Sequence, residues 1–407
     1  MNMIRLLVIV VLAALALSAA ATQEHLSCTA ELGTTRFDGA AAGVDLNNNP
    51  FAWFIKQTQS GIHFIAQLDL FTGSPLSGST VTVGVSAPNL PVAGGAVFGL
   101  PAVVYQYTQQ FYFSACPTEA CTSPSTVALG NGGVQGKAVD FATTGNGVVA
   151  VLHDAGANLI YLDLSNTAHT SFTSHTVVTL ATGTTVQGLA LTYAPGSTPH
   201  YYGMITDNSG ANSFLTCTTA PSCTTTALAQ TGAVQSDSCT LNNGSPLCSW
   251  TDSTGTYLYV SLGTTPTVLT VLTLPSPLSF NGNTAVVNST QDTVTVFTVV
   301  INGNTGTANL HVLTLNCSTT SCVVLAQANS TQVDDTSKSF SLAAWASTNA
   351  FGVVYAQPLT LENGLLSCTL ANGARRRSIV EPPAAASAAA SLALLGLAAA
   401  LTLLLVF

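Results

Sequence analysis

One short apolar segment recurs seven times in this 407-residue chain, about once every 50 residues, and this spacing limits the fold more than any other feature. Each copy is rich in the β-branched and aromatic residues that favour a strand. The copies begin at Phe51, Val103, Val148, Tyr201, Leu247, Val294 and Phe351. Most run into a turn with Asp or Asn shortly before Gly, as in Asp207-Asn208-Ser209-Gly210. In hairpin turns the Asp or Asn side chain bonds to its own backbone and Gly adopts a positive φ angle, so the repeating unit is predicted to contain a β-hairpin.

Further strands complete the unit. One follows each turn, for example at 213–217, and another precedes each hairpin, for example at 189–193. No long helical periodicity separates the units. A four-stranded unit repeated about seven times predicts an all-β fold, a seven-bladed β-propeller. The alternative is an array of tandem β-sandwich domains, although each of those needs about 100 residues.

The chain has ten cysteines, which in a secreted protein indicate disulfides. Their spacing does not fix the connectivity, but it suggests pairs. Three pairs fall at the turn between the third and fourth strands of their units: Cys116 with Cys121, Cys217 with Cys223, and Cys317 with Cys322. Cys239 and Cys248 fall on adjacent first and second strands. We expect no metal site, because these spacings differ from the C-x₂-C pattern of zinc ligands.

Cys28 and Cys368 are left over, and they occupy equivalent positions. Cys368 ends a third strand as Cys217 does, and Cys28 begins a fourth strand as Cys223 does. We therefore expect the N-terminal strand to complete the last blade, with Cys28–Cys368 closing the ring. A bond across a loop of about 340 residues should stabilise the fold by several kcal/mol in the chain-entropy model.

The period and the cysteine positions together resemble those of secreted β-propeller repeat proteins that staple a blade hairpin with nearby cysteines. The resemblance covers about residues 26–372 and identifies no specific family. It implies ligand binding, adhesion or, in some such proteins, catalysis, because a propeller by itself carries little functional information.

Both ends of the chain have the pattern of a processing signal. Residues 1–21 combine a charged start, an apolar run and small residues, which predicts a signal peptide. Residues 22–372 form the predicted ectodomain. Residues 373–407 contain a polar spacer and an apolar tail over 384–407, the pattern of a signal for a GPI anchor near Asn372. The alternative is a single C-terminal membrane span. Either ending predicts a surface protein that uses the secretory pathway.

The predicted ectodomain, residues 22–372, has few charges: four basic and 16 acidic residues. So few basic groups cannot neutralise a phosphate backbone, so we expect no nucleic-acid partner. Glycans would help to solubilise such a surface. Four sequons are candidate glycosylation sites: Asn243, Asn288, Asn316 and Asn329. Asn288 and Asn329 are the better candidates, because Pro246 follows the first sequon and Cys317 lies inside the third.

The sequence contains no recognisable catalytic motif. A glycosidase needs two carboxylates that face one sugar bond. The candidates are Asp140, Asp163, Asp237, Asp292 and Glu362. Asp154, Asp207 and Asp252 are predicted turn residues, and Asp334-Asp335 is a predicted solvated loop rather than a calcium site. We expect no catalytic residue, no metal ligand and no cofactor.

Three other patterns also favour structural roles. His153 precedes Asp154, but it has no accompanying nucleophile and is a predicted strand-end residue. The segment 251–257 only partly matches a sialidase Asp box, and the ectodomain has a single arginine, Arg36, for gripping a carboxylate. The tryptophans are predicted core residues, with sugar stacking as the alternative: Trp53, Trp250 and Trp345.

These patterns predict a GPI-anchored cell-surface glycoprotein that acts without catalysis, as a binding, adhesion or coat module with a glycan or protein ligand. The alternative is a GPI-anchored extracellular hydrolase that acts on glycans.

Overall fold

The computed structural model describes residues 26–370, with gaps. The gaps are 34–38, 45–49, 59–60, 70–74, 77–80, 85–91, 108, 118–123, 130–137, 145, 156–158, 197–199, 219–221, 230–237, 291–292, 319, 334–340, 348–349 and 357–362. Several predictions therefore lie outside the described residues: those on the two terminal signals, Asn372, Cys121, Asp237, Asp292, Asp334, Asp335 and Glu362. Among the described residues, no helix is long and apolar enough to span a membrane.

The described strands form seven sheets, which we number as blades 1 to 7, with strands A to D from the innermost outward. Blade 1 contains β2 (Gly39–Val44), β3 (Pro50–Thr58), β4 (Gly61–Asp69), β5 (Pro75–Leu76) and β6 (Val81–Gly84). Blade 2 contains β7 (Val92–Val97), β8 (Leu100–Tyr107), β9 (Gln110–Ala115) and β10 (Ser125–Ala128). Blade 3 contains β11 (Val139–Thr143), β12 (Val149–Asp154), β13 (Leu159–Ser165) and β14 (Phe172–Thr179).

The other four blades follow the same order. Blade 4 contains β15 (Val186–Ala194), β16 (His200–Asp207), β17 (Asn212–Thr218) and β18 (Cys223–Ala227). Blade 5 contains β19 (Ser238–Asn242), β20 (Ser245–Thr251), β21 (Tyr257–Leu262) and β22 (Thr267–Thr273). Blade 6 contains β23 (Leu278–Thr290), β24 (Thr293–Asn302), β25 (Thr307–Cys317) and β26 (Cys322–Val333). Blade 7 contains β27 (Ser341–Ala346), β28 (Phe351–Ala356), β29 (Asn363–Leu370) and β1 (Leu26–Gly33).

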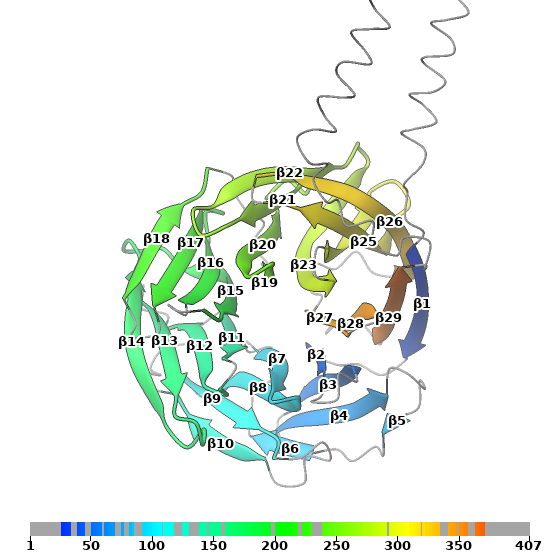
Figure 1. Cartoon of the computed structure of the whole chain (residues 1–407). Helices are drawn as coiled ribbons and strands as arrows, with labels where there is room; N and C mark the ends of the chain where they lie inside the picture. The colour runs from blue at the N-terminus through cyan, green and yellow to red at the C-terminus, as the bar shows by residue number, and fades with distance from the viewer. Residues whose placement is uncertain are drawn as a thin grey trace, which may run out of the picture. The chain divides into compact units, whose positions relative to one another are not determined.

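The seven sheets form a closed ring (Figure 1). Their innermost strands touch in the order β2, β7, β11, β15, β19, β23 and β27, and β27 touches β2 again. Tandem β-sandwiches would not bring the first and last units together, so the propeller prediction is confirmed. One detail differs from the prediction: the strand predicted at 189–193 already begins at Val186 as part of β15, where the register shifts by a bulge.

The N-terminal strand completes the last blade, as the sequence predicts. β1 pairs with β29 as the outermost strand of blade 7, and the Cys28–Cys368 disulfide joins these two strands. The two strands lie side by side in Figure 1. Residues 340 positions apart are thereby held in one sheet, so separation of the chain ends requires this blade to open.

The other described disulfides also match the pairs suggested by spacing. They are Cys217–Cys223, Cys239–Cys248 and Cys317–Cys322, and in each the two cysteines face each other across neighbouring strands. Cys116 is disulfide-bonded as well, although its predicted partner Cys121 lies outside the described residues.

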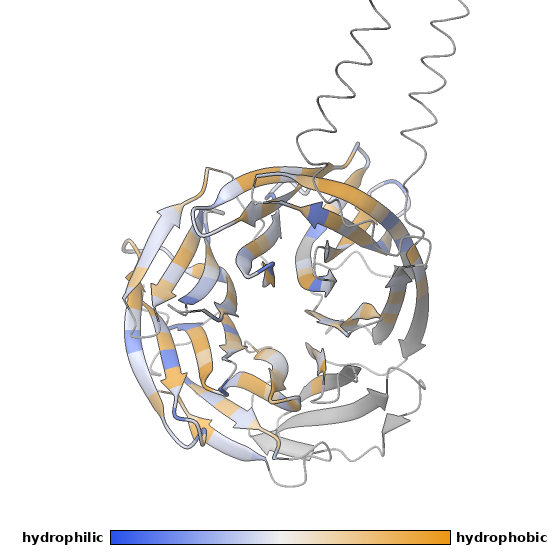
Figure 2. Ribbon diagram, in the orientation of Figure 1, coloured by the Kyte–Doolittle hydropathy of each residue, from blue (hydrophilic) through white to orange (hydrophobic). Residues whose placement is uncertain are grey.

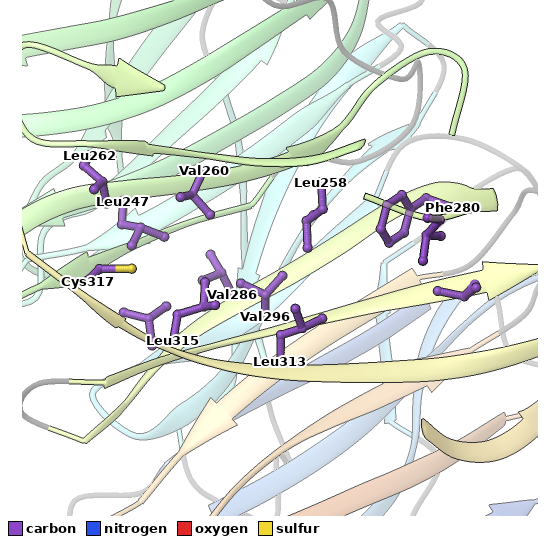
Figure 3. Packing of buried hydrophobic residues seen from close by; sticks show 13 residues of the cluster. Leu247, Leu258, Val260, Leu262, Phe280, Val286, Val296, Leu313, Leu315 and Cys317 are labelled. Carbon is purple, nitrogen blue, oxygen red and sulfur yellow. The ribbon is translucent and has the colours of Figure 1, made fainter. Parts of the chain in front are cut away.

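The core lies between blades rather than in one central mass. Every residue of β12 and of β28 is buried, because a B strand is covered on both faces by neighbouring blades. Figure 3 shows the contact between blades 5 and 6, where Leu258 and Val260 of β21 face Val286 and Val296. Hydrophobic residues recur along the coloured strands in Figure 2. Burial of these apolar side chains is the main stabilising contribution.

The ring has two faces with different turns. Because successive strands alternate in direction, the A–B and C–D turns lie at one end of each sheet and the B–C turns at the other. We name the first end the staple face, because it carries the C–D disulfides Cys217–Cys223, Cys317–Cys322 and Cys28–Cys368. We name the second end the acidic face, because its B–C turns carry Asp154, Asp207 and Asp252. Neighbouring blades agree in direction, since the Asn242 amide in blade 5 donates to the Cys317 carbonyl in blade 6 at 2.8 Å.

Candidate functional site

The turn aspartates stabilise the acidic face. Asp252 accepts hydrogen bonds from the backbone N–H groups of Thr256 and Tyr257, both at 2.7 Å, and from the Thr254 hydroxyl. Asp207 accepts from the N–H groups of two residues in its own turn, at 2.8 and 2.9 Å. Asp154 is buried and accepts from the Ala138 N–H at 3.2 Å. Asp207 and Asp252 organise their own hairpins, which is the role that the sequence predicts for them. The bond of Asp154 joins the end of β12 to the residue before β11, so it links two strands.

Asp140 and Asp163, the two described carboxylates proposed for a catalytic pair, do not face each other. Asp140 is opposite Leu152, whereas Asp163 is opposite Val151, the neighbouring residue on the shared strand β12. Successive side chains of a strand point to opposite faces of the sheet. The two carboxylates therefore project from opposite faces of blade 3 and cannot act together on one sugar bond.

Asp163 has a different partner, His153, which the sequence predicts only as a strand-end residue. The His153 Nε2 atom lies 3.1 Å from Asp163 Oδ2, and both side chains are fully buried. The rings of Phe111 and Tyr161 lie 4.8 and 5.8 Å from the His153 ring. No solvent or substrate reaches this pair, so we assign it a structural role inside blade 3.

Asp140 links two blades at the innermost ring of strands. Its Oδ2 accepts from the N–H of Leu191 in blade 4 at 2.7 Å, and its Oδ1 accepts from the Phe141 N–H at 2.8 Å. Burial raises its pKa to about 7, although the two backbone N–H groups act in the opposite direction. Ser238 makes the corresponding link from blade 5, accepting from the Val286 N–H at 3.1 Å. The position of Asp140 therefore suits a contact between blades.

The feature that best suits a ligand lies on the staple face, at the A–B turn of blade 2. Phe98 and Gly99 form a two-residue hairpin between the paired residues Val97 and Leu100. Their φ angles are +49° and +71°, the left-handed conformation that such a turn requires. This conformation costs a residue with a Cβ about 1 to 2 kcal/mol, and Asn or Gly normally occupies it. Phe98 is nevertheless present, with 47 % of its surface exposed.

The Phe98 ring rests on the next blade. It lies over Gly147 in the A–B turn of blade 3, so closely that a Cβ at Gly147 would be 1.8 Å from the ring carbon Cζ. Gly147 itself has φ +83°. A side chain at this position is therefore excluded for two reasons, the backbone conformation and the aromatic ring above it. The ring is thus held in a defined position although much of it faces solvent.

His169, in the C–D turn of blade 3, completes the cluster. Its Nε2 lies 2.6 Å from the Gly147 carbonyl oxygen, which can only accept, so Nε2 carries the proton. In the neutral ring Nδ1 is then an acceptor. The ring centroid lies 6.4 Å from that of Phe98 and 5.9 Å from that of Phe113. His169 also has a left-handed backbone, with φ +53°. We name Phe98, Gly147 and His169 the aromatic cluster.

Exposed polar side chains lie next to members of the aromatic cluster in the chain. Asn146 is exposed, and its Oδ1 accepts from the Thr144 hydroxyl at 2.7 Å. Asn166 and Thr170, both exposed, are joined at 2.8 Å in the turn that contains His169. An exposed aromatic face beside amide and hydroxyl groups can receive a ligand that has one apolar face and a polar rim.

Neither Phe98 nor His169 stands out in the sequence alone. The one unusual feature in the sequence is the dipeptide Phe-Gly at a hairpin where Asn-Gly is usual. It points to a site only once the structure shows that the Phe98 ring packs on Gly147 of the next blade. The predicted core tryptophans behave as expected where their side chains are described, because Trp250 and Trp345 are buried. Trp53 lies on β3, and its side chain is outside the described residues.

The sequons occupy different environments. Asn243, Asn316 and Asn329 are exposed. Asn288 is half-buried, and its Oδ1 is buried with no hydrogen-bond partner among the described residues. Asn288 is therefore less accessible than its sequence pattern suggests. Among the described residues, no three His, Cys, Asp or Glu side chains gather in a way that could hold a metal ion.

No protein-family model matches the chain, and no curated protein sequence matches it. Solved structures share its fold. An ulvan lyase, described as a polysaccharide lyase, is 10 % identical, with 82 % of this chain and 92 % of the lyase aligned and a TM-score of 0.51. BBS1N in its complex with ARL6DN is 10 % identical over 87 % of this chain and 98 % of that chain, with a TM-score of 0.50.

A fucose-specific lectin from Aleuria aurantia is 12 % identical over 74 % of this chain and 96 % of the lectin, with a TM-score of 0.43. A score this low supports no argument about this chain. Identities of 10 % show the propeller fold alone, and propellers serve several functions. The function therefore has to be inferred from the aromatic cluster and from the sequence.

Proposed function

We propose that the protein is a cell-surface propeller that binds a sugar through the aromatic cluster and catalyses no reaction. The observation that carries this proposal is the exposed Phe98 ring, held in an unfavourable backbone conformation against Gly147. Unfavourable backbone conformations persist where the surrounding structure enforces them, and they are concentrated at functional sites.

A sugar fits the chemistry of the cluster. One face of a pyranose ring presents C–H groups, which carry partial positive charge and pack on the negative face of an aromatic ring. Its hydroxyl groups can donate to His169 Nδ1 and to side-chain oxygens, and they can accept from the Asn146 amide. Such a contact is small, so we expect a single site to bind weakly and a multivalent ligand to bind tightly.

The location of the protein is also a proposal. The pattern of residues 1–21 and the disulfides support entry into the secretory pathway. The pattern of 373–407 supports a GPI anchor near Asn372, with a single C-terminal span as the alternative. Exposed Asn243, Asn316 and Asn329 support glycosylation. Release of the protein from cells by a phosphatidylinositol-specific phospholipase would distinguish the anchor from the span.

The sugar-binding proposal can be tested with the full chain displayed on cells. Cells that express it are probed with fluorescent multivalent oligosaccharides of varied composition, beside cells that express the Phe98→Asn variant at the same surface level. We expect a subset of the probes to bind the unchanged protein and to lose at least about tenfold in binding to the variant, or about 1.4 kcal/mol. Equal binding to both proteins would refute the site. Absence of binding by any probe, both to the cells and to the protein released from them by the phospholipase, would refute the function.

One observation favours a second candidate, a glycan hydrolase. The carboxyl group of Asp140 has a pKa raised to about 7, so it is partly protonated near neutral pH, as a general acid must be. Its two backbone hydrogen bonds fit the structural link equally well. Hydrolysis of any probe by the purified chain, abolished by Asp140→Asn, would favour this candidate, whereas sugar binding unaffected by Asp140→Asn favours the first.

A further inference from the structure

The last strand of the propeller ends on the staple face. β29 is the C strand of blade 7, and C strands run from the acidic face toward the C–D turns. Leu370 is its final residue, and the predicted attachment residue Asn372 follows two positions later. Two extended residues span at most about 7 Å. An anchor at Asn372 would therefore hold the staple face close to the membrane.

The described turns of the two faces differ in their acidic residues. None of the described turn residues on the staple face is Asp, Glu, Lys or Arg; the turns include 98–99, 166–171, 243–244 and 263–266. The acidic face carries Asp207, which is half-buried, and Asp154 and Asp252, which are both buried and hydrogen-bonded.

The exposed hydrophobic side chains show the same asymmetry. The two most exposed large hydrophobic residues described are Val323 and Phe98, at 61 % and 47 %. Phe98 lies in an A–B turn and Val323 lies at the start of β26, so both belong to the staple face. Tyr257, at 39 %, is on the opposite face. The two most exposed of these side chains therefore lie on the staple face, one in blade 2 and one in blade 6.

We infer that the staple face is the membrane-proximal face, so that the aromatic cluster binds sugars carried by lipids of the same membrane rather than sugars on an opposing cell. This inference rests on the proposed function, because it takes both the anchor and the sugar site from it. It adds the orientation and the source of the sugar. Glycans on Asn243 and Asn316, in blades 5 and 6, would fill the gap between ring and membrane and leave blades 2 and 3 clear.

The orientation can be measured on the full chain at the cell surface. A short peptide tag is inserted in the turn 263–266 of blade 5, on the staple face, or in the turn 303–306 of blade 6, on the acidic face. The two turns have the same length and lie in neighbouring blades. A fluorophore bound to the tag transfers energy to an acceptor dye in the outer leaflet. We expect higher transfer efficiency from 263–266, and equal or reversed efficiencies would overturn the inference.

A second measurement uses the untagged protein and so does not depend on tolerance of an insertion. Beads coated with a binding oligosaccharide are offered to the anchored protein and to an equal amount of the same protein after phospholipase release into solution. We expect the anchored form to capture several times fewer beads, because its staple face is occluded. Equal capture contradicts the orientation while leaving sugar binding intact. If neither form binds a small soluble probe, the proposed function fails, whatever the tags report.

Discussion

Two A–B turns of the propeller have nearly the same backbone and different side chains. Phe98-Gly99 in blade 2 has φ angles of +49° and +71°, and Asn243-Gly244 in blade 5 has +49° and +76°. Asn-Gly is the usual sequence for this turn. A Cβ at Gly244 would meet nothing within 4 Å, whereas the Phe98 ring is packed on the Gly147 backbone of the next blade. The backbone alone therefore does not require Phe98, and the reason for an aromatic side chain must lie outside the turn.

The largest expected effect is on stability, and it separates the cost of the left-handed backbone from the cost of displacing the Phe98 ring. Gly147→Ala should lower the free energy of unfolding by about 2 to 4 kcal/mol, because the new Cβ is in a left-handed conformation and displaces the Phe98 ring. Gly244→Ala, with the same backbone conformation in open space, should cost only about 1 to 2 kcal/mol. Thermal and denaturant unfolding with the disulfides intact measure both.

A double variant sharpens this result. In a Phe98→Asn background, Gly147→Ala should cost no more than Gly244→Ala does, because the ring that fills the space has gone. If the cost of Gly147→Ala is unchanged in that background, the ring contact contributes nothing and the comparison between the turns fails.

The next effect concerns pH and the contact between blades 3 and 4. Asp140 has a pKa of about 7 in the folded protein, above its ordinary value of 3.8, so the folded state binds the proton more tightly than the unfolded state. Stability linked to this group is therefore greatest below pH 4 and is lost as the pH rises to about 7. Asp140→Asn should remove this component of the pH dependence.

The measurement is the difference in unfolding free energy between the two proteins across pH 4 to 8. As the pH rises to about 7, the unfolding free energy of the Asn variant should increase relative to that of the unchanged protein. Above that pH the difference between the two free energies should stay constant. Parallel pH profiles would mean that Asp140 titrates normally. Ser238→Ala, which removes the uncharged counterpart of this link, should lower stability without changing the profile.

The smallest effect is on the stability of the Phe98 turn itself. Phe98→Asn should change the free energy of unfolding by less than about 1 kcal/mol, because relief of the left-handed backbone offsets the lost contact with Gly147. Phe98→Ala should be less stable than Phe98→Asn, since it loses the contact and keeps the unfavourable backbone. An Asn variant that is clearly less stable than the Ala variant would show that Phe98 is a core residue.

The fold was accessible from the sequence because its signals are local. Asp- and Asn-containing turns at a spacing of about 50 residues predict hairpins in series, and the leftover Cys28 and Cys368 predict that the ends meet. Hairpin chemistry and cysteine spacing need no knowledge of the partner blade. The roles of Asp207 and Asp252 could be predicted for the same reason, since their bonds stay within one turn.

The candidate site could not be predicted from the sequence, because its residues contact neighbours that are far away in the sequence. Phe98 meets Gly147 across a blade boundary, and Asp140 meets Leu191 in the next blade. Sequence reasoning also treated Asp140 and Asp163 as equivalent candidates. Only the strand register, which a single sequence does not specify, places them on opposite faces of blade 3.

The central claim, that Phe98 is present to contact a sugar, is tested most directly by comparing Phe98→Asn with Phe98→Tyr. Both variants of the full chain are displayed on cells and titrated with an oligosaccharide that the unchanged protein binds. We predict that Phe98→Tyr retains affinity within about threefold, because the aromatic face is kept, and that Phe98→Asn loses at least about tenfold despite a stable turn. Equal affinity of the two variants would contradict the account, because it would mean that the aromatic ring at position 98 does not contribute to sugar binding.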